Sequence, residues 1–254
     1  MNSLSSISQP AEPLSEAEEW ELRCDLAATF RIFARNNWNE QIGNHHSMML
    51  PGTNQFLINP RGMLYREIRA SDLIVCDLAG NKVRGKGEVR RIAFNIHAEV
   101  HKLHPQAACV LHVHPPYLTA FSLIKGGRFA LAHQNNLFLN GRTAYDDGHH
   151  GIHFGPAEGQ RIAEALGNKS ILIMAGHGVT IVGPRISDAF DELYMAERTC
   201  MYQMLAMQTG QPLLQQADDM QLNWPGSFGD YLDSRMHLDA WRRVLDREEP
   251  DYKS

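Results

Sequence analysis

The sequence lacks any long hydrophobic run. None of its 254 residues lies in a stretch that approaches the roughly 18 consecutive apolar residues needed to span a bilayer. The N-terminal segment MNSLSSISQPAEPLSEAEEW also has no basic stretch followed by an apolar one, as a secretory signal would have. We therefore expect a cytoplasmic protein that does not use a membrane as a partner.

Basic residues are neither abundant nor concentrated. Lys and Arg total 24 against 29 Asp and Glu, the formal net charge is -5, and the basic residues are scattered. Binding to nucleic acid through its phosphates requires a concentrated basic surface. The composition therefore argues against nucleic acid as a partner.

Cysteine is also scarce. The four cysteines, Cys24, Cys76, Cys109 and Cys200, are far apart and form no CxxC pair, and three of the four lie in apolar runs. This distribution is typical of buried, reduced thiols and not of a disulfide framework.

The length and the hydrophobic fraction of 43% suit one α/β domain with a sizeable core. We predict a flexible tail over 1–14, a domain over 15–210, and an extension over 211–254 that packs on the domain or on a neighbouring subunit. Apolar residues at helical spacing predict helices over 16–36, 90–104, 119–124, 157–166 and 187–208, with Ser15 and Ser187 as N-caps. Short apolar runs between turn residues predict strands near 46–50, 56–58, 73–76, 108–111 and 170–174.

Histidine is the unusually frequent residue, with thirteen copies, most of them between Ile96 and Gly178. His112 and His114 are two apart, so on a strand they share a face and can bind one ion. His177 follows another predicted buried strand. Three imidazoles with an open fourth position are typical of a catalytic site for Zn, and Fe, Mn or Co are also suitable. The alternative is that these histidines only form local hydrogen bonds at strand ends.

Four segments, in this order and spacing, resemble the class II aldolase/adducin family: GNHHS (43–47), FLINPRGMLYREIRASDL (56–73), IHAEVHKLHPQAACVLHVHP (96–115) and AGHGVTIVG (175–183). The resemblance covers roughly residues 22–208 and is closer to the adducin-like bacterial branch. It implies a three-layer α/β/α fold with a mixed, largely antiparallel central sheet. It also implies a homotetramer and a divalent cation, usually Zn, bound by His112, His114 and His177.

The chain departs from the sugar-phosphate enzymes of that family at one motif. They have Ser-Ser followed by Glu or Asp, the acidic residue standing four positions before the residue equivalent to His97. Here that position is Ala93, and Arg91-Ile92 replaces the serine pair that would bind phosphate. Glu88 and Glu99 are candidates for the missing carboxylate, although each has a simpler role as a surface charge. His97 and His101 share a helix face, but in HAEVH the Glu is not at the offset that the HExxH motif requires, so we discount a metalloprotease.

Further site residues follow from the resemblance. The segment 145–151 is similar to an HDYHG loop near the metal, so Tyr145, His149 and His150 are candidate catalytic proton donors or bases, with a surface loop as the alternative. Asn44 and His46 are the candidate substrate-binding residues. His237 and Tyr231 are candidates for residues that a neighbouring subunit contributes.

These features predict a divalent-metal-dependent lyase that cleaves a C–C bond by retro-aldol reaction or decarboxylation. Because the phosphate-binding serines are missing, we expect a small hydroxy- or oxo-acid without phosphate as the substrate. Two alternatives are a non-catalytic adducin-like scaffold and an Fe(II) oxygenase on the same fold.

Overall fold

The centre of the structure is one mixed sheet. A computed structural model describes residues 12–148, 155–214 and 233–254. In these residues eight strands are ordered β4-β3-β2-β1-β5-β8-β7-β6, and every neighbouring pair is antiparallel except β6 and β7. The strands are β1 (His45–Met49), β2 (Gln55–Ile58), β3 (Ile74–Asp77), β4 (Lys82–Arg84), β5 (Cys109–Val113), β6 (Thr143–Asp146), β7 (Ile171–Met174) and β8 (Gly178–Gly183).

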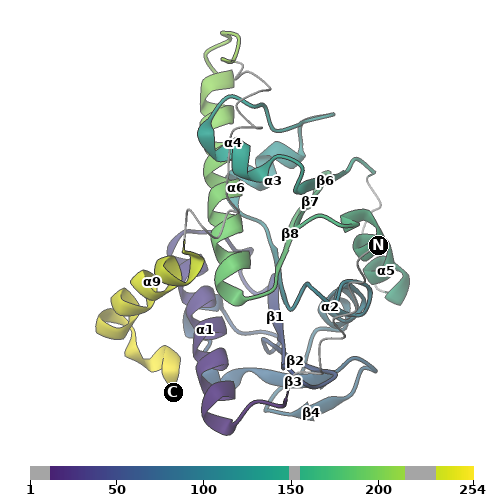
Figure 1. Cartoon of the computed structure of the whole chain (residues 1–254), viewed down its shortest axis with the longest axis vertical. Helices are drawn as coiled ribbons and strands as arrows, with labels where there is room; N and C mark the ends of the chain where they lie inside the picture. Colours follow the sequence, from purple (N-terminus) through teal and green to yellow (C-terminus); the bar gives the residue numbers. More distant parts are fainter. Residues whose placement is uncertain (1–11, 149–154, 215–232) are drawn as a thin grey trace, which may run out of the picture.

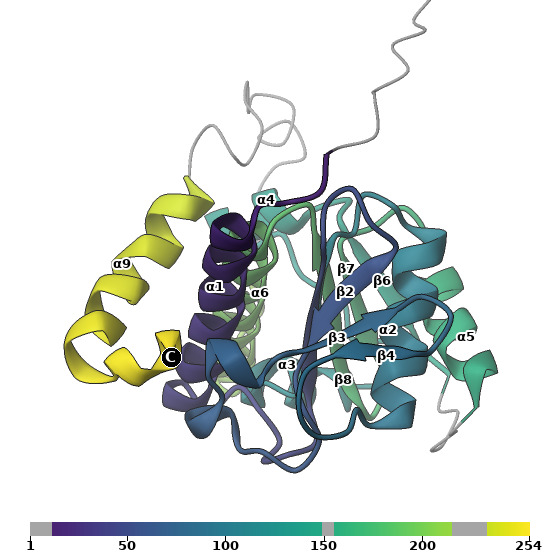
Figure 2. The same cartoon turned by 90° about the horizontal axis from the view of Figure 1, so that it is seen from below.

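Helices cover both faces of this sheet, which confirms the predicted three-layer α/β/α fold (Figures 1 and 2). One face carries α1 (Glu16–Arg35), α3 (Pro116–Ser122), α4 (Gln134–Leu139) and α6 (Ile186–Met207), and the other carries α2 (Arg91–Leu103) and α5 (Pro156–Leu166). Three short 3-10 helices are η1 (Tyr65–Glu67), η2 (Ala70–Asp72) and η3 (Pro250–Lys253). No described helix has the length and apolar character needed to cross a membrane.

Alternation along β5 determines which side chains face which helices. Leu111 and Val113 pack in the cluster that includes α1 and α6, whereas Val110 packs in the cluster of α2 and α5. Because successive strand residues point to opposite faces, His112 faces the α2 and α5 side, as Val110 does. This side of the sheet carries the candidate site.

The cap prediction is confirmed for α1 and wrong for α6. Ser15 accepts a hydrogen bond from the backbone N–H of Glu18, and the Glu18 carboxylate accepts one from the Ser15 backbone N–H, which completes the capping box. The N-cap of α6 is Arg185, not Ser187. Ser187 is buried in the first turn, where its hydroxyl lies 3.2 Å from the hydroxyl of Ser234. The partner that holds Ser187 is therefore a distant residue, which the local pattern does not indicate.

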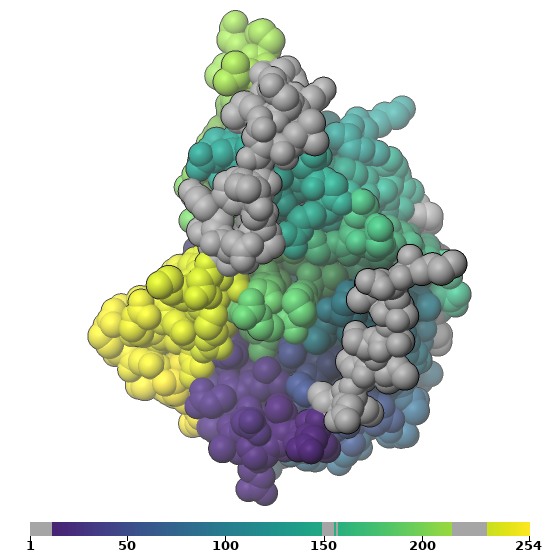
Figure 3. Space-filling model, viewed as in Figure 1, coloured from purple at the N-terminus to yellow at the C-terminus, as the bar shows by residue number. Residues whose placement is uncertain are grey.

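The described part of the C-terminal extension packs on the domain of the same chain. Helix α9 (Ser234–Glu248) lies against α1 and α6, and its Leu238 and Leu245 are fully buried. Asp25 of α1 forms ion pairs with Arg235 and with Arg242, the latter at 2.6 Å. In the space-filling view the yellow C-terminal segment adjoins the purple N-terminal one (Figure 3). All four cysteines are buried and unpaired, as predicted.

Candidate metal centre

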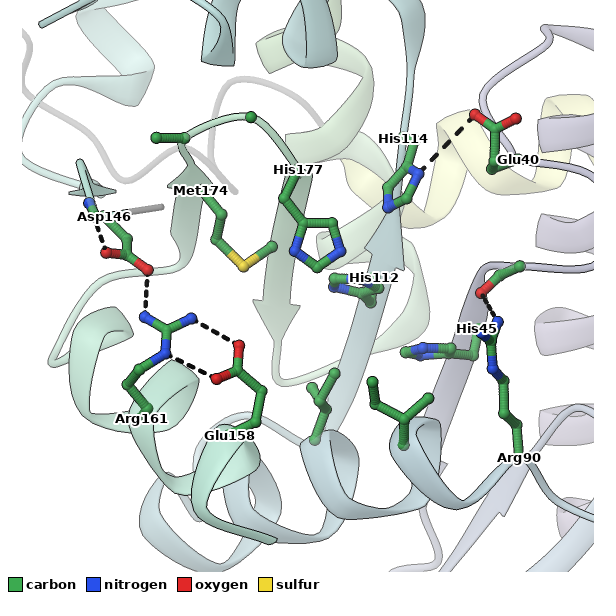
Figure 4. Close-up of a pocket in the computed structure, with 16 residues that line it drawn as sticks. Glu40, His45, Arg90, His112, His114, Asp146, Glu158, Arg161, Met174 and His177 are labelled. Carbon is green, nitrogen blue, oxygen red and sulfur yellow. Dashed lines mark hydrogen bonds and ion pairs between the residues drawn. The ribbon is translucent and has the colours of Figure 1, made fainter. Parts of the chain in front are cut away.

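Three histidines from two neighbouring strand ends converge. His112 belongs to β5, His114 is the first residue after β5, and His177 lies in the turn between β7 and β8. One nitrogen from each ring can be chosen so that all three lie within 4.8 Å of one another. The rings face the same space in Figure 4. The structure therefore brings together the three residues that the sequence predicts as metal ligands.

A hydrogen bond orients the ring of His112, and a carboxylate lies near the ring of His114. His112 Nδ1 lies 3.0 Å from the Thr180 hydroxyl on the paired strand β8, so Nε2 is left for a ligand. A carboxylate oxygen of Glu40 lies 4.0 Å from His114 Nδ1. His114 Nε2 is inaccessible to solvent and has no hydrogen-bond partner. A metal-binding imidazole typically has its second nitrogen held by such a neighbour, and a cation would satisfy the unpaired nitrogen of His114.

Burial keeps the ligands in the form that binds metal. It lowers the pKa of His114 to about 4 and that of His112 well below its ordinary value of 6.5, and neighbouring imidazoles lower both further. A proton would compete with the metal for the same lone pair. Both rings are therefore neutral near pH 7, so these donors fit a divalent cation such as zinc.

The HG motif at 177–178 has a steric origin. A Cβ atom at Gly178 would lie 2.5 Å from Cδ2 of His114 and 2.7 Å from the carbonyl oxygen of Val113. Only glycine allows β8 to begin this close to the end of β5. The glycine thus permits His114 and His177 to approach one another.

A cavity of about 640 Å³ opens beside the three histidines. Ile92 and Ile96 of α2 form an apolar part of its wall. Arg161, also at the wall, forms ion pairs with Glu158 and Asp146 (Figure 4). Unlike Arg161, Arg90 is exposed and has no ion pair within the described residues. Its only hydrogen bond there goes to the carbonyl of Gly43, 3.3 Å away. A cation is thus available at the cavity for an anionic ligand.

The positions considered for the missing carboxylate do not supply one. Ala93 is buried in an apolar cluster with Phe56 and Ile58 and does not line the cavity. Glu88 is exposed outside the cavity, and Glu99 pairs with Lys102 on the surface. The carboxylates that do line the cavity belong to Glu40, Asp146 and Glu158.

The structure places His46 away from the cavity. Its ring stacks on Phe30 with the centroids 4.3 Å apart, on the α1 side of the sheet. The preceding residue, His45, lines the cavity instead and stacks on His112 at 4.8 Å. Strand alternation gives one residue to each face, so the geometry supports His45 and not His46 near the metal ligands. The sequence-based prediction named the neighbouring residue, His46, which lies on the other face of the strand.

Asn44 lies outside the cavity and holds the loop that carries Glu40. Its side-chain oxygen accepts a hydrogen bond from the backbone N–H of Glu40 at 2.6 Å, and its Nδ2 is buried without a partner. Asn44 does not itself line the cavity, although Glu40 and Gly43 do. Its described role is to shape the loop that carries Glu40.

The other predicted residues are dispersed. The hydroxyl of Tyr145 accepts a hydrogen bond from the backbone N–H of Phe129, and its ring lies outside the metal cavity. His237 is held within its own chain by Asp191, at 2.5 Å from Nδ1 to the carboxylate. His149, His150 and Tyr231 lie outside the described residues.

Comparison with known proteins identifies the class. A family model described as Class II Aldolase and Adducin N-terminal domain matches residues 24–204, and the chain belongs to this family. A Caulobacter vibrioides protein named "Putative aldolase class 2 protein" is 34% identical over 244 residues, with 94% of each chain covered. Alpha-adducin of Rattus norvegicus is 34% identical over 188 residues, which are 72% of this chain and 25% of that one. The crystal structure of an aldolase II superfamily protein from Pseudomonas syringae matches with a TM-score of 0.86 and 30% identity, over 95% of this chain and 98% of that one.

Proposed function

We propose that this protein is a divalent-metal-dependent lyase that cleaves a C–C bond in a small hydroxy- or oxo-acid, by retro-aldol reaction or decarboxylation. The observation that carries the proposal is the convergence of His112, His114 and His177 beside a cavity of about 640 Å³. Zinc suits three neutral imidazoles best, and Fe, Mn or Co are also compatible with them.

The cavity wall favours a carboxylate without phosphate. Ile92 occupies the position where the sugar-phosphate enzymes have a serine, and it lines the cavity with an apolar side chain. Arg90 offers a planar guanidinium that suits a carboxylate. One cation beside an apolar wall suits a small acid better than a phosphate ester, which needs more donors.

Each residue has a definable task in such a reaction. A divalent cation held by the three histidines would polarise a carbonyl oxygen and stabilise the negative charge that C–C cleavage leaves. Arg90 would hold the substrate carboxylate, while Ile92 and Ile96 exclude water from one side of it. We propose His149 or His150 as the proton carrier, because Gly148, directly before them, lines the cavity.

Metal content is the first test. Protein purified without chelator should contain about one divalent ion per chain by elemental analysis, and His112→Ala should lose it. His104→Gln is a matched control, since His104 bonds the carbonyl of Ala163 outside the cavity. Equal metal content in all three proteins would contradict the site.

Turnover is the second test. Purified, metal-loaded protein is incubated with panels of 4-hydroxy-2-oxo-acids, which can undergo retro-aldol cleavage, and of 2-hydroxy-, 2-oxo- and 3-oxo-acids, and released aldehyde or carbon dioxide is measured. Turnover of an unphosphorylated acid that disappears in His112→Ala and persists in His104→Gln is expected. An empty site would favour the scaffold role suggested by the similarity to alpha-adducin. A strict need for Fe(II) and dissolved oxygen would favour an oxygenase.

A further inference from the structure

Behind the metal centre, a continuous line of hydrogen bonds joins three buried histidines and one serine. His45 Nδ1 lies 2.7 Å from His97 Nε2, and His97 Nδ1 lies 2.5 Å from the Ser47 hydroxyl. The same hydroxyl lies 2.8 Å from His101 Nε2, and His101 Nδ1 lies 2.9 Å from the carbonyl oxygen of Ala107. We call this line the histidine chain. It runs between β1 and α2 and ends at His45, beside the metal ligands.

The carbonyl at one end sets the direction of every bond in the histidine chain. A carbonyl oxygen only accepts, so His101 Nδ1 must carry a hydrogen, and its Nε2 is then an acceptor. The Ser47 hydroxyl therefore donates its one hydrogen to His101 and accepts from His97 Nδ1. His97 Nε2 is then left as an acceptor for a hydrogen on Nδ1 of His45.

This directionality requires neutral rings, and burial provides them. It lowers the pKa of His101 to about 4 and that of His97 well below 6.5, and His45 is itself buried. In neutral His45 the second nitrogen, Nε2, carries a lone pair and no hydrogen. That nitrogen has no partner in the described protein and is not among the enclosed unpaired atoms, while the ring lines the cavity (Figure 4).

From this geometry we infer that His45 is a specificity-determining residue: the histidine chain fixes it in the tautomer whose Nε2 accepts a hydrogen bond in the cavity, so the site selects an acid that carries a hydroxyl over the matching oxo-acid. A hydroxyl donates to this nitrogen, whereas a carbonyl oxygen would oppose one lone pair with another. The inference deepens the proposed function, on which its substrate class rests.

The tautomer itself can be measured without any substrate or metal. In protein with ¹⁵N-labelled histidine, long-range ¹H–¹⁵N spectra distinguish a ring with hydrogen on Nδ1 from one with hydrogen on Nε2. We expect the Nδ1–H form for His45, His97 and His101, assigned by loss of each signal in single variants. A His45 ring with hydrogen on Nε2 would overturn the inference.

Two variants test whether the histidine chain is the cause. Ser47→Ala removes the acceptor of His97 Nδ1, so His45 should acquire some of the other tautomer, and Ser47→Thr should restore the wild-type form. Thr29→Val is a matched control, because the Thr29 hydroxyl bonds His46 on the opposite face of the same strand, at 3.0 Å. An unchanged His45 spectrum in folded Ser47→Ala protein would also overturn the inference.

Binding tests the selectivity. Zinc-loaded protein is titrated with each enantiomer of lactate and with pyruvate, which differ only at carbon 2, where lactate has a hydroxyl and pyruvate a carbonyl. We expect one lactate to bind on the order of tenfold more tightly than pyruvate, and the preference to shrink to about twofold in His45→Gln with zinc still bound. Equal affinities, or a preference for pyruvate, would overturn the inference. If neither acid binds, the proposed substrate class fails, and the spectra alone decide the state of His45.

Discussion

Replacing His46 with leucine is expected to make the protein more resistant to acid. The His46 ring packs between Phe30 and Phe33 with centroid distances of 4.3 and 4.6 Å, and its Nδ1 bonds the Thr29 hydroxyl. Its Nε2 is buried with no partner. Burial therefore lowers the pKa of His46 well below the ordinary value of 6.5.

The magnitude follows from proton linkage. Below pH 6.5 the unfolded chain binds a proton at His46 that the folded protein excludes, so the contribution of neutral His46 to stability is present above pH 6.5 and is lost as the pH falls. Between about pH 7.5 and about pH 5 this loss amounts to about 2 kcal/mol for one histidine. His46→Leu removes it. At about pH 7.5 the variant should lie within about 1 kcal/mol of the wild type, because it loses one hydrogen bond and also one unpaired buried nitrogen.

The assay is urea unfolding followed by circular dichroism at several pH values, in chelator so that metal release does not contribute. The difference in unfolding free energy between His46→Leu and the wild type should move by about 2 kcal/mol in favour of the variant as the pH falls from about 7.5 to about 5. Thr29→Val keeps the histidine and should differ from the wild type by a constant amount. A constant difference for His46→Leu as well would refute the reasoning.

Three further outcomes are expected. Gly178→Ala should weaken zinc affinity at least tenfold, because its Cβ would lie 2.5 Å from Cδ2 of His114. The control Gly155→Ala, in which no heavy atom lies within 4 Å of the added carbon, should bind zinc normally, and equal affinities of the two variants would refute the steric argument. Glu197→Ala should lower the unfolding free energy by roughly 3 kcal/mol, because the buried carboxylate accepts two backbone N–H groups at the start of α3; a change below about 1 kcal/mol in thermal or urea unfolding would show that water replaces it. Arg90→Gln should raise the dissociation constant of a bound carboxylate about tenfold by calorimetry while zinc content stays the same, and unchanged affinity would remove this arginine from the site.

Local pattern predicts much of the fold. The capping box at Ser15 and the apolar spacing after it define α1 to within one residue, because both signals lie within the helix itself. Strands β4 and β6 and the helices α4 and α9 were not predicted. Strand β8 was not predicted either, because the segment GVTIVG overlaps the motif that supplies His177 and was assigned to that motif alone. Its place beside β5 depends on tertiary pairing.

In the candidate site too, residues in local motifs are predicted from the sequence, and contacts between separate elements are not. The three metal ligands stand in recognisable motifs, and the structure brings them together. His45 was missed because the pairing of β1 with β5, which sets His45 opposite His112, cannot be derived from either strand alone. Its bond to His97 likewise needs α2 to lie over β1. Sequence spacing gives the residues of each element, and the register between elements decides which residues meet.

Strand β1 has histidines on both of its faces, one in the cavity and one in the apolar layer. Inserting or deleting a single residue inside 45–49 would exchange them: a ring suited to apolar packing would enter the cavity, and Ser47 would leave its bonds to His97 and His101. The length of this short strand therefore determines which of its side chains reach the site. Insertions and deletions should be tolerated in the turn at 51–54 but not within β1, about four residues earlier. Protein engineers can therefore lengthen the chain at the turn but not in the strand before it.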